Sequence, residues 1–280
     1  MIHHLTFTQL VENSVGAPGL LAEHGVAVFV EADGHHLLFD TGQGLTLRHN
    51  AQQLGMSMAS VEHIILSHGH YDHSGGLVDA LRMTDPVDLY LHPEALNAKY
   101  NRNGRQIGAP VSDEQTIAPL VKRIIPTREP TEIVPGIHAT GEIPRTNPIE
   151  DTGGPFYRDA DRTAPDELLD DQALYVETSE GLIVLLGCGH SGVINTLEYI
   201  QKLSGGKPIH AVIGGMHLLH ATPERLAFTG GSLSRMQVQY LAPNHCTGLE
   251  AVCYFKNRFP DAFHESRAGA SHAFGAVNPE

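Results

Sequence analysis

Short apolar runs, each bounded by Gly, Asp, Ser or Pro, recur along both halves of this chain of 280 residues. They are rich in Val, Ile and Leu and cover residues 26–30, 36–39, 64–66, 89–91, 174–176, 182–186, 211–213 and 238–241. Bounded runs of this kind predict strands, several of them buried on both faces. Residues 45–54, 76–81, 193–203 and 249–259 have helical spacing. The alternation predicts an α/β fold in which helices cover sheets.

One region differs from the rest of the chain in composition. Residues 101–171 are rich in Pro, Gly, Thr, Arg and acidic residues and have few periodic apolar positions. We expect long loops around a short strand or two, acting as a lid or binding loop, with a plain linker as the alternative. With 41% hydrophobic residues the whole chain, 1–280, can bury one large core, so we expect a single domain.

Charge and cysteine content restrict the partners and the compartment. The formal net charge is −14 and no cluster of Lys or Arg interrupts the acidity, so nucleic acid is not an expected partner. No apolar stretch has the length of a membrane span, and the N-terminus lacks the basic start and apolar run of a signal peptide. The odd number of cysteines, 3, fits a reducing compartment. We expect a cytoplasmic protein that acts on a small molecule.

The strongest chemical signal follows the run that ends at Leu66. It reads Ser-His-Gly-His-Tyr-Asp-His-Ser-Gly-Gly, residues 67–76. Side chains at i and i+2 of an extended segment point the same way, so His68 and His70 can bind one ion. If a helix begins near Ser74, Asp72 and His73 turn toward a second ion nearby. The alternative is a surface histidine cluster with no ligand role.

Three apolar runs in the second half also end beside a histidine and a glycine. Residues 188–192 contain His190, residues 214–218 contain His217, and residues 243–248 contain His245. A structural histidine explains any one of them, but packing alone explains all three poorly. They are candidates for the remaining metal ligands.

The pattern His-x-His-x-Asp-His after a strand resembles the hallmark motif of the metallo-β-lactamase superfamily. The resemblance implies an αββα sandwich, in which two mixed sheets pack face to face and helices cover both outer faces. Residues 38–42, Leu-Phe-Asp-Thr-Gly, resemble the strand and turn that precede the motif there. In that superfamily the aspartate, here Asp40, helps to organise the site. By itself Asp40 is equally a turn or helix-cap residue.

Over nearly its whole length the chain is similar to one branch of that superfamily, the dihydropterin ribofuranosylaminobenzene-phosphate synthase-like proteins. The matching segments occur in order at residues 12–14, 38–42, 66–77, 140–145, 171–174, 187–196, 214–218 and 245–248. The branch name implies a phosphorylated, pterin-type substrate.

This sequence and its branch depart from the wider superfamily pattern at two points. No His-x-x-Gly-His segment precedes Asp171, and Cys188 replaces the usual bridging aspartate. We assign His190 as the missing ligand of the first metal and Cys188 as a bridging or adjacent soft ligand, with an inert buried thiol as the alternative. His245 fits the last ligand of the second metal. His217 is either that ligand, an outer group that supports the ligands, or a catalytic or substrate-binding residue.

This ligand set favours two divalent metal ions, zinc first, with iron or manganese as alternatives. Such a site activates a hydroxide, and Asp72 would bind metal and also carry the proton to the leaving group. We therefore expect a hydrolase acting on a phosphoester or cyclic phosphate. The alternatives are a lactonase or thioesterase with the same site, or a metal-containing ligand-binding or sensor protein without turnover, which the altered Cys188 position motivates.

Two further observations bear on the reaction and the substrate. No Gly-x-Ser-x-Gly elbow or glycine-rich phosphate loop is present, which disfavours serine catalysis and nucleotide-loop chemistry. Arg145 is a candidate clamp for a phosphate or carboxylate, because a guanidinium binds two oxygens at once. A surface salt bridge between Arg145 and Glu142 or Glu150 is the alternative.

Overall fold

A computed structural model describes residues 1–275 and contains two mixed β-sheets. The seven-stranded sheet has the order β13-β1-β2-β3-β4-β5-β6. Its strands are β1 (His4–Val11), β2 (Ala27–Ala32), β3 (His35–Phe39), β4 (His63–Ile65), β5 (Val87–Leu91), β6 (Val121–Pro126) and β13 (Ser271–Gly275). The strands from β13 to β3 pair antiparallel, and those from β3 to β6 pair parallel.

The six-stranded sheet has the order β12-β11-β10-β9-β8-β7. Its strands are β7 (Thr131–Val134), β8 (Ile137–Ala139), β9 (Ala173–Thr178), β10 (Gly181–Leu186), β11 (Ile209–Gly215) and β12 (Tyr240–Asn244). The strands from β10 to β12 are parallel, and those from β7 to β10 are antiparallel.

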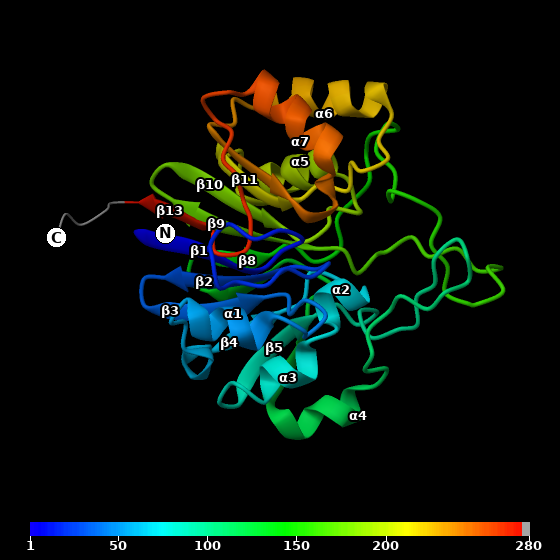
Figure 1. Cartoon of the computed structure of the whole chain (residues 1–280). Helices are drawn as coiled ribbons and strands as arrows, with labels where there is room; N and C mark the ends of the chain where they lie inside the picture. Colours follow the sequence, from blue (N-terminus) through cyan, green and yellow to red (C-terminus); the bar gives the residue numbers. More distant parts are fainter. Residues whose placement is uncertain (276–280) are drawn as a thin grey trace.

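Helices cover the outer face of each sheet (Figure 1). The seven-stranded sheet carries α1 (Leu47–Gln53), α3 (Leu77–Leu81) and α4 (Glu114–Ile117) on this face, and the short α2 (Tyr71–Ser74) lies at the end of the sheet. The six-stranded sheet carries α5 (Val193–Leu203), α6 (Pro223–Arg235) and α7 (Leu249–Arg258). Short 3-10 turns occur at Met58–Ser60, Ala118–Leu120 and His245–Thr247. No helix in residues 1–275 combines the length and the apolar character that crossing a membrane requires.

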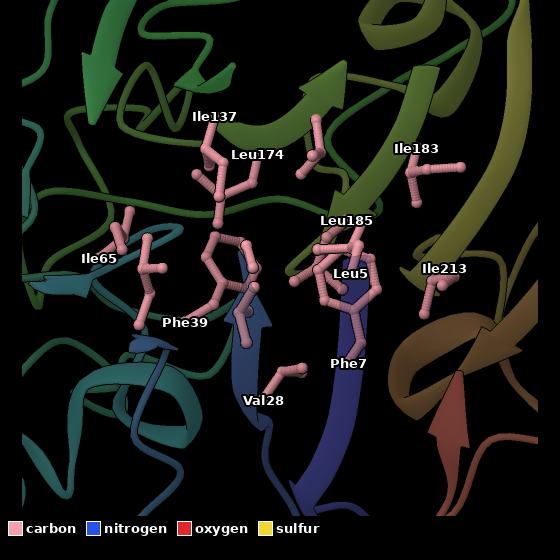
Figure 2. Packing of buried hydrophobic residues seen from close by; sticks show 14 of the residues in the cluster. Leu5, Phe7, Val28, Phe39, Ile65, Ile137, Leu174, Ile183, Leu185 and Ile213 are labelled. Atoms are coloured by element: carbon pink, nitrogen blue, oxygen red, sulfur yellow. The ribbon is translucent and has the colours of Figure 1, made fainter. Parts of the chain in front are cut away.

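The main core lies between the two sheets, as Figure 2 shows for side chains that meet from strands of both. Alternate residues of each strand face this core or the helices outside. Ile183 and Leu185 of β10 face inward, whereas Val184 packs beneath the outer helices. Both faces of such a strand are buried, which explains why the apolar runs in the sequence are continuous rather than alternating. The predicted α/β sandwich is confirmed.

Some elements differ from the prediction. The strands β1, β6, β7, β8 and β13 and the helices α4 and α6 were not predicted, and β12 begins two residues later than the run that predicted it. Three of the missed strands lie within residues 101–171, where one or two were expected. The edge strand β6 is mostly exposed, and α6 contains Gly230 and Gly231, so neither has a clear apolar period. The region also contains α4 and the 3-10 turn at Ala118–Leu120, and its long loops extend from one end of the sandwich (Figure 1).

Candidate metal centre

Residues that follow strands of both sheets meet at one end of the sandwich. The segment after β4 provides His68 and His70 and continues into α2, which carries Asp72 and His73. From the other sheet, Cys188 and His190 follow β10, His217 follows β11, and His245 follows β12. The carboxyl ends of parallel strands meet at the same edge of a sheet, and this is where α/β folds build their sites.

Two groups of these side chains have the spacing of a metal site and share one residue, and a third, less buried group joins His24 to Asp72 and His245. His68, Cys188 and His190 form the first, and His73, Cys188 and His245 form the second. Within each group the potential ligand atoms all lie within 4.8 Å of one another, and all five residues are buried. Cys188 therefore occupies the position between the two groups.

The imidazole ring of His70 also lies beside the first group. His68 Nε2 lies 3.0 Å from His70 Nδ1, and the rings of His70 and His190 are 4.9 Å apart. His190 Nδ1 lies 2.7 Å from the carbonyl oxygen of Thr152, so that nitrogen is the donor and Nε2 keeps its lone pair. Among the described residues, neither His70 Nε2 nor His190 Nε2 has a hydrogen-bond partner, although both are buried.

Burial keeps these histidines in the form that binds metal. It lowers the pKa of His68 and His190 well below the ordinary value, and neighbouring histidines lower it further. The pKa of His70 falls to about 3, again mainly because of burial. The neutral, buried His70 and His190 each keep an Nε2 atom without a hydrogen-bond partner among the described residues, and such atoms are suitable ligands, so the residues fit a bound cation.

In the second group the donor atoms also face one another. His73 Nε2 lies 3.2 Å from His245 Nε2 and 3.1 Å from Cys188 Sγ. Asp72 Oδ2 is 3.4 Å from His245 Nε2 and 3.1 Å from Nε2 of His24, a residue with an exposed side chain. Burial alone would raise the pKa of Asp72, but these histidines hold it well below its usual range. Asp72 is therefore an ionised carboxylate.

Asp40 and Asn13 fix the orientation of the second group. Asp40 Oδ2 lies 2.7 Å from His73 Nδ1, and both carboxylate oxygens of Asp40 accept hydrogen bonds from Ser67. Asn13 Oδ1 lies 3.1 Å from His245 Nδ1. Each partner binds Nδ1 and leaves Nε2 directed at the group, an arrangement common around metal-binding histidines. The role that the resemblance implied for Asp40 agrees with these contacts.

The backbone at the site is held in unusual conformations. Three non-glycine residues have positive φ: Asp40 at 61°, His217 at 44° and His245 at 50°. Such angles are uncommon outside glycine and cluster at functional sites. Gly69, between the two motif histidines, passes so close to Ala95 that a Cβ would lie 1.8 Å from its carbonyl oxygen. Only glycine fits between His68 and His70.

A buried ion-pair cluster holds the motif segment at Gly69 in place. Lys99 Nζ lies 2.8 Å from Asp170 Oδ1 and 3.3 Å from Asp166 Oδ2. The other oxygen of Asp170 accepts a hydrogen bond of 2.8 Å from the backbone N–H of Gly69. The cluster thus links the loops of residues 101–171 to the motif.

The His190 side is held by the start of α5. Glu150 accepts hydrogen bonds from the backbone N–H groups of Ile194 and Asn195, both at 2.9 Å, and so caps the helix from a distant segment. The Asn195 side chain accepts from the backbone of Thr146 and Asn147. This clamp sets the position of residues 146–152, and with it the carbonyl of Thr152 that orients His190.

A cavity of about 560 Å³ opens onto both groups. Phe156 and Ile107, from the loops of residues 101–171, and Leu219 and Leu249 contribute apolar lining, and His24 and His217 contribute polar lining. The Phe156 ring lies 5.0 Å from that of His70. Part of the region expected to form a lid therefore does line the cavity.

The structure places His217 beside the first group. Its ring lies 4.3 Å from that of His190, and burial, His245 and Arg225 lower its pKa to about 4. A Cβ at Gly153 would lie 1.9 Å from His217 Nδ1. His217 is not one of the residues in the two groups within residues 1–275. Of the roles considered for it, a catalytic, supporting or substrate-binding role fits this position best.

Arg145 is not brought to this cavity. It lines a separate hollow with Arg128, Glu129, Glu142 and Glu167, and its guanidinium donates to the backbone carbonyl of Glu167. Glu142 pairs with Arg128 and Glu150 caps α5, so neither alternative partner holds Arg145. The geometry does not support Arg145 as a clamp on a substrate at the metal site.

The positions of His24, Lys99 and Asp170 at the site were not predicted from the sequence, and no role was predicted for Asn13. His24 has no motif around it, and the ion-pair cluster joins residues 67 or more positions apart. Asn13 follows β1, whose alternating Leu5 and Phe7 were a detectable strand signal. That signal would have placed residues 12–14 at a strand end like the other site segments.

Comparisons with known proteins agree with the geometry. The family model described as "Metallo-beta-lactamase superfamily" matches residues 21–202. A "7,8-dihydropterin-6-methyl-4-(beta-D-ribofuranosyl)-aminobenzene-5'-phosphate synthase" of Methanocaldococcus jannaschii is 29% identical over 261 residues, 89% of each chain. An uncharacterized protein of the same organism is 34% identical and covers 82% of this chain and 86% of its own.

A solved structure, Tm1679, described as "a metal-dependent hydrolase of the beta-lactamase superfamily", superposes with a TM-score of 0.83. It is 30% identical and covers 97% of this chain and 100% of its own. The family model covers more than half of the chain, and the relatives extend the likeness over most of the rest. This chain belongs to the metallo-beta-lactamase superfamily.

Proposed function

We propose that this protein is a metal-dependent hydrolase with a dinuclear site, preferentially zinc, that acts on a phosphoester or cyclic phosphate of a small molecule. The observation that carries the proposal is the sharing of Cys188 between two groups of buried ligand atoms. A single-ion site needs one such group, and a pair that meets at one thiol suits two neighbouring cations.

The proposed ligands divide between the two groups. His68, His70 and His190 would hold one ion, Asp72, His73 and His245 the other, and Cys188 would contact both. When bound there, two cations would supply water activation and polarisation of a carbonyl or phosphoryl oxygen of the substrate.

The protein side chains then supply orientation and proton transfer. The ionised Asp72 accepts a hydrogen bond from Nε2 of His24, whose pKa this contact raises. In the proposed reaction a protonated His24 passes its Nε2 proton by way of Asp72 Oδ2 to the leaving group, which leaves a neutral His24 and an ionised Asp72. His217, neutral because its pKa is about 4, lines the same cavity and would offer a ring nitrogen to the substrate.

The substrate assignment rests on the relatives and on the cavity. One relative is a synthase whose name includes a dihydropterin and a 5'-phosphate. The similarity to it extends over most of both chains. A pterin-related molecule has a flat ring, which suits a cavity lined by Phe156, Tyr71 and Leu249. We therefore place a pterin-related phosphoester first among the candidates.

The first experiment measures metal in the purified protein. We expect close to two equivalents in the parent and a clear loss in His68→Ala. His49→Ala is a matched control, since His49 is partly exposed and its one hydrogen-bond partner in the described chain is the carbonyl oxygen of Gly19. Equal and negligible metal in the parent and in His68→Ala would refute the site.

The second experiment compares substrates on the metal-loaded protein. We expect chromogenic phosphodiesters to be hydrolysed faster than lactones or thioesters, and His68→Ala to lose the activity. Faster lactone or thioester hydrolysis would reassign the chemistry within the same site. Full metal content without hydrolysis of any ester class would contradict an enzymatic role and favour a ligand-binding or sensor protein.

A further inference from the structure

A second hollow adjoins the metal cavity and has a different character. It encloses about 360 Å³ and is lined by Arg102, Asp151, Gly153, Gly154, His217, His220, Thr222 and Arg225, among others. His217 and His220 line both cavities, so the two spaces meet at these residues. A single ligand can therefore extend from the metal site into this hollow.

Arg225 is the unusual residue of the hollow. It lies in the first turn of α6 and is only 4% exposed. Its Nη1 donates to Asp151, but its Nε and Nη2 are buried and have no acceptor within the described part of the chain. Buried guanidinium N–H groups are rarely left unpaired, because the lost hydration is costly.

The two free groups of Arg225 form the side of the guanidinium that binds two oxygens. Nε–H and Nη2–H are parallel donors spaced to match a phosphate or carboxylate. The N-terminus of α6, capped by Thr222, also borders the hollow, and its partial positive charge favours an anion. A buried arginine with a free donor pair thus sits next to a helix start.

The balance of charge supports the same conclusion. Two arginines line the hollow against one aspartate, in a protein whose formal net charge is −14. The hollow around Arg145 is the opposite, with Arg128 and Arg145 facing Glu129, Glu142 and Glu167. An anion is attracted to the first hollow and repelled by the second.

We propose that the hollow at Arg225 is a phosphate-binding subsite, which holds a phosphate group of the substrate while another part of the molecule reaches the metal site. The proposal rests on the proposed function, because it defines the substrate of that same site. It narrows the substrate class to molecules with a terminal phosphate set apart from the bond that is broken. It also assigns to Arg225 the clamp role that the sequence analysis gave to Arg145.

The test uses inorganic phosphate as the probe and calorimetric titration of the metal-loaded protein. We expect two binding events in the parent, one at the metals and one in the hollow. Arg225→Gln should lose the second event or weaken it at least tenfold. His68→Ala should retain it, because His68 is not among the residues that line the hollow.

Arg145→Gln tests directly whether Arg145, rather than Arg225, binds the phosphate. It should bind phosphate as the parent does, and loss of an event in this variant would overturn the proposal in favour of Arg145. If Arg225→Gln does not fold, Arg225→Lys decides, because it keeps the charge beside Asp151 but not the paired donors. Parent-like phosphate affinity in Arg225→Lys, or in a folded Arg225→Gln, would also overturn the proposal.

The outcomes distinguish this inference from the proposed function. If the protein hydrolyses no ester, the second phosphate event still reports on the hollow. If the hollow binds no phosphate, the metal content and the hydrolysis of simple phosphodiesters remain as proposed.

Discussion

Asp40 Oδ2 lies 2.7 Å from His73 Nδ1 in a site where both side chains are fully buried. The contact fixes which imidazole nitrogen carries the proton, so that Nε2 of His73 is directed at Cys188 and His245. Ser67 donates to the same carboxylate through its backbone and its hydroxyl. Asp40 thus connects the end of β3 to the motif that follows β4 without being one of the proposed ligands.

Asp40→Asn should weaken binding of one metal ion while preserving the fold. Asparagine tolerates the positive φ of 61° at this position but cannot accept from Ser67 and His73 as a carboxylate does. Loss of such a supporting residue weakens metal affinity by about 10-fold to 100-fold. Competition with a chromophoric chelator measures the affinity of each equivalent.

Asp33→Asn is the control for that experiment. Asp33 also has a positive φ, 48°, and accepts backbone hydrogen bonds from His3 and His4, far from the site. It should bind metal as the parent does. Equal metal affinities in the parent and in Asp40→Asn would show that His73 needs no partner at Nδ1.

Cys188→Ser should remove a thiolate from the metal centre. In cobalt-substituted protein we expect the near-ultraviolet charge-transfer band of a thiolate ligand in the parent and its loss in the variant. Burial raises the pKa of the Cys188 thiol well above its usual value, so only a bound cation would hold it as a thiolate at neutral pH. Cys253→Ser, at the exposed cysteine, should retain the band. A parent without the band would mean that Cys188 is an inert buried thiol.

The strands that could be predicted from the sequence are those that are apolar on both faces. Strands such as β3 and β10 are apolar on both faces because the sheets pack on each other and on helices, and that produces continuous runs. β1 mixes polar residues such as Thr6 and Gln9 with Leu5 and Phe7, so its signal was weaker. The missed strands β6 and β13 lie at the edges of the seven-stranded sheet, where fewer side chains need to be apolar.

Some residues of the candidate site could likewise be predicted from the sequence, and others could not. The proposed ligand residues follow apolar strands and have side chains suited to metal, so His68, His73, His190 and His245 stood out in the sequence. Residues that act through long-range contacts did not. Nothing near Arg225 indicates that its guanidinium would be buried beside the metal cavity, because that depends on how α6 packs. Arg145, which is exposed, was the arginine predicted from the sequence, but it is less suited to the role of a phosphate clamp than Arg225.

Lys99→Ala should destabilise the protein strongly. The substitution leaves the buried carboxylate of Asp170 without its cation and leaves Asp166 with only the longer contact of 3.9 Å to Arg158, and breaking a buried ion pair costs about 3–5 kcal/mol. The segment at Gly69 depends on Asp170, so metal affinity should fall as well. Denaturant unfolding measures the first effect and chelator competition the second.

Lys207→Ala provides the comparison for Lys99. Lys207 Nζ lies 2.7 Å from Glu177 in a partly exposed pair, and such pairs contribute about 0–1 kcal/mol. A Lys99→Ala variant no less stable than Lys207→Ala would contradict the structural role of the buried cluster.

His272 should make the stability of the fold fall in acid. Burial lowers its pKa to about 4 in β13, where its ring lies between Tyr240 and Ser266. In the unfolded chain its pKa is about 6.5, so the unfolded state takes up the proton first as the pH falls. The contribution of the neutral His272 to stability is therefore complete above pH 6.5 and is lost progressively down to about pH 4, by up to about 3 kcal/mol.

His272→Gln can keep both hydrogen bonds but does not titrate. The difference in unfolding free energy between the parent and this variant should shift in favour of the variant across that window, and a difference independent of pH would show that His272 does not titrate differently on folding.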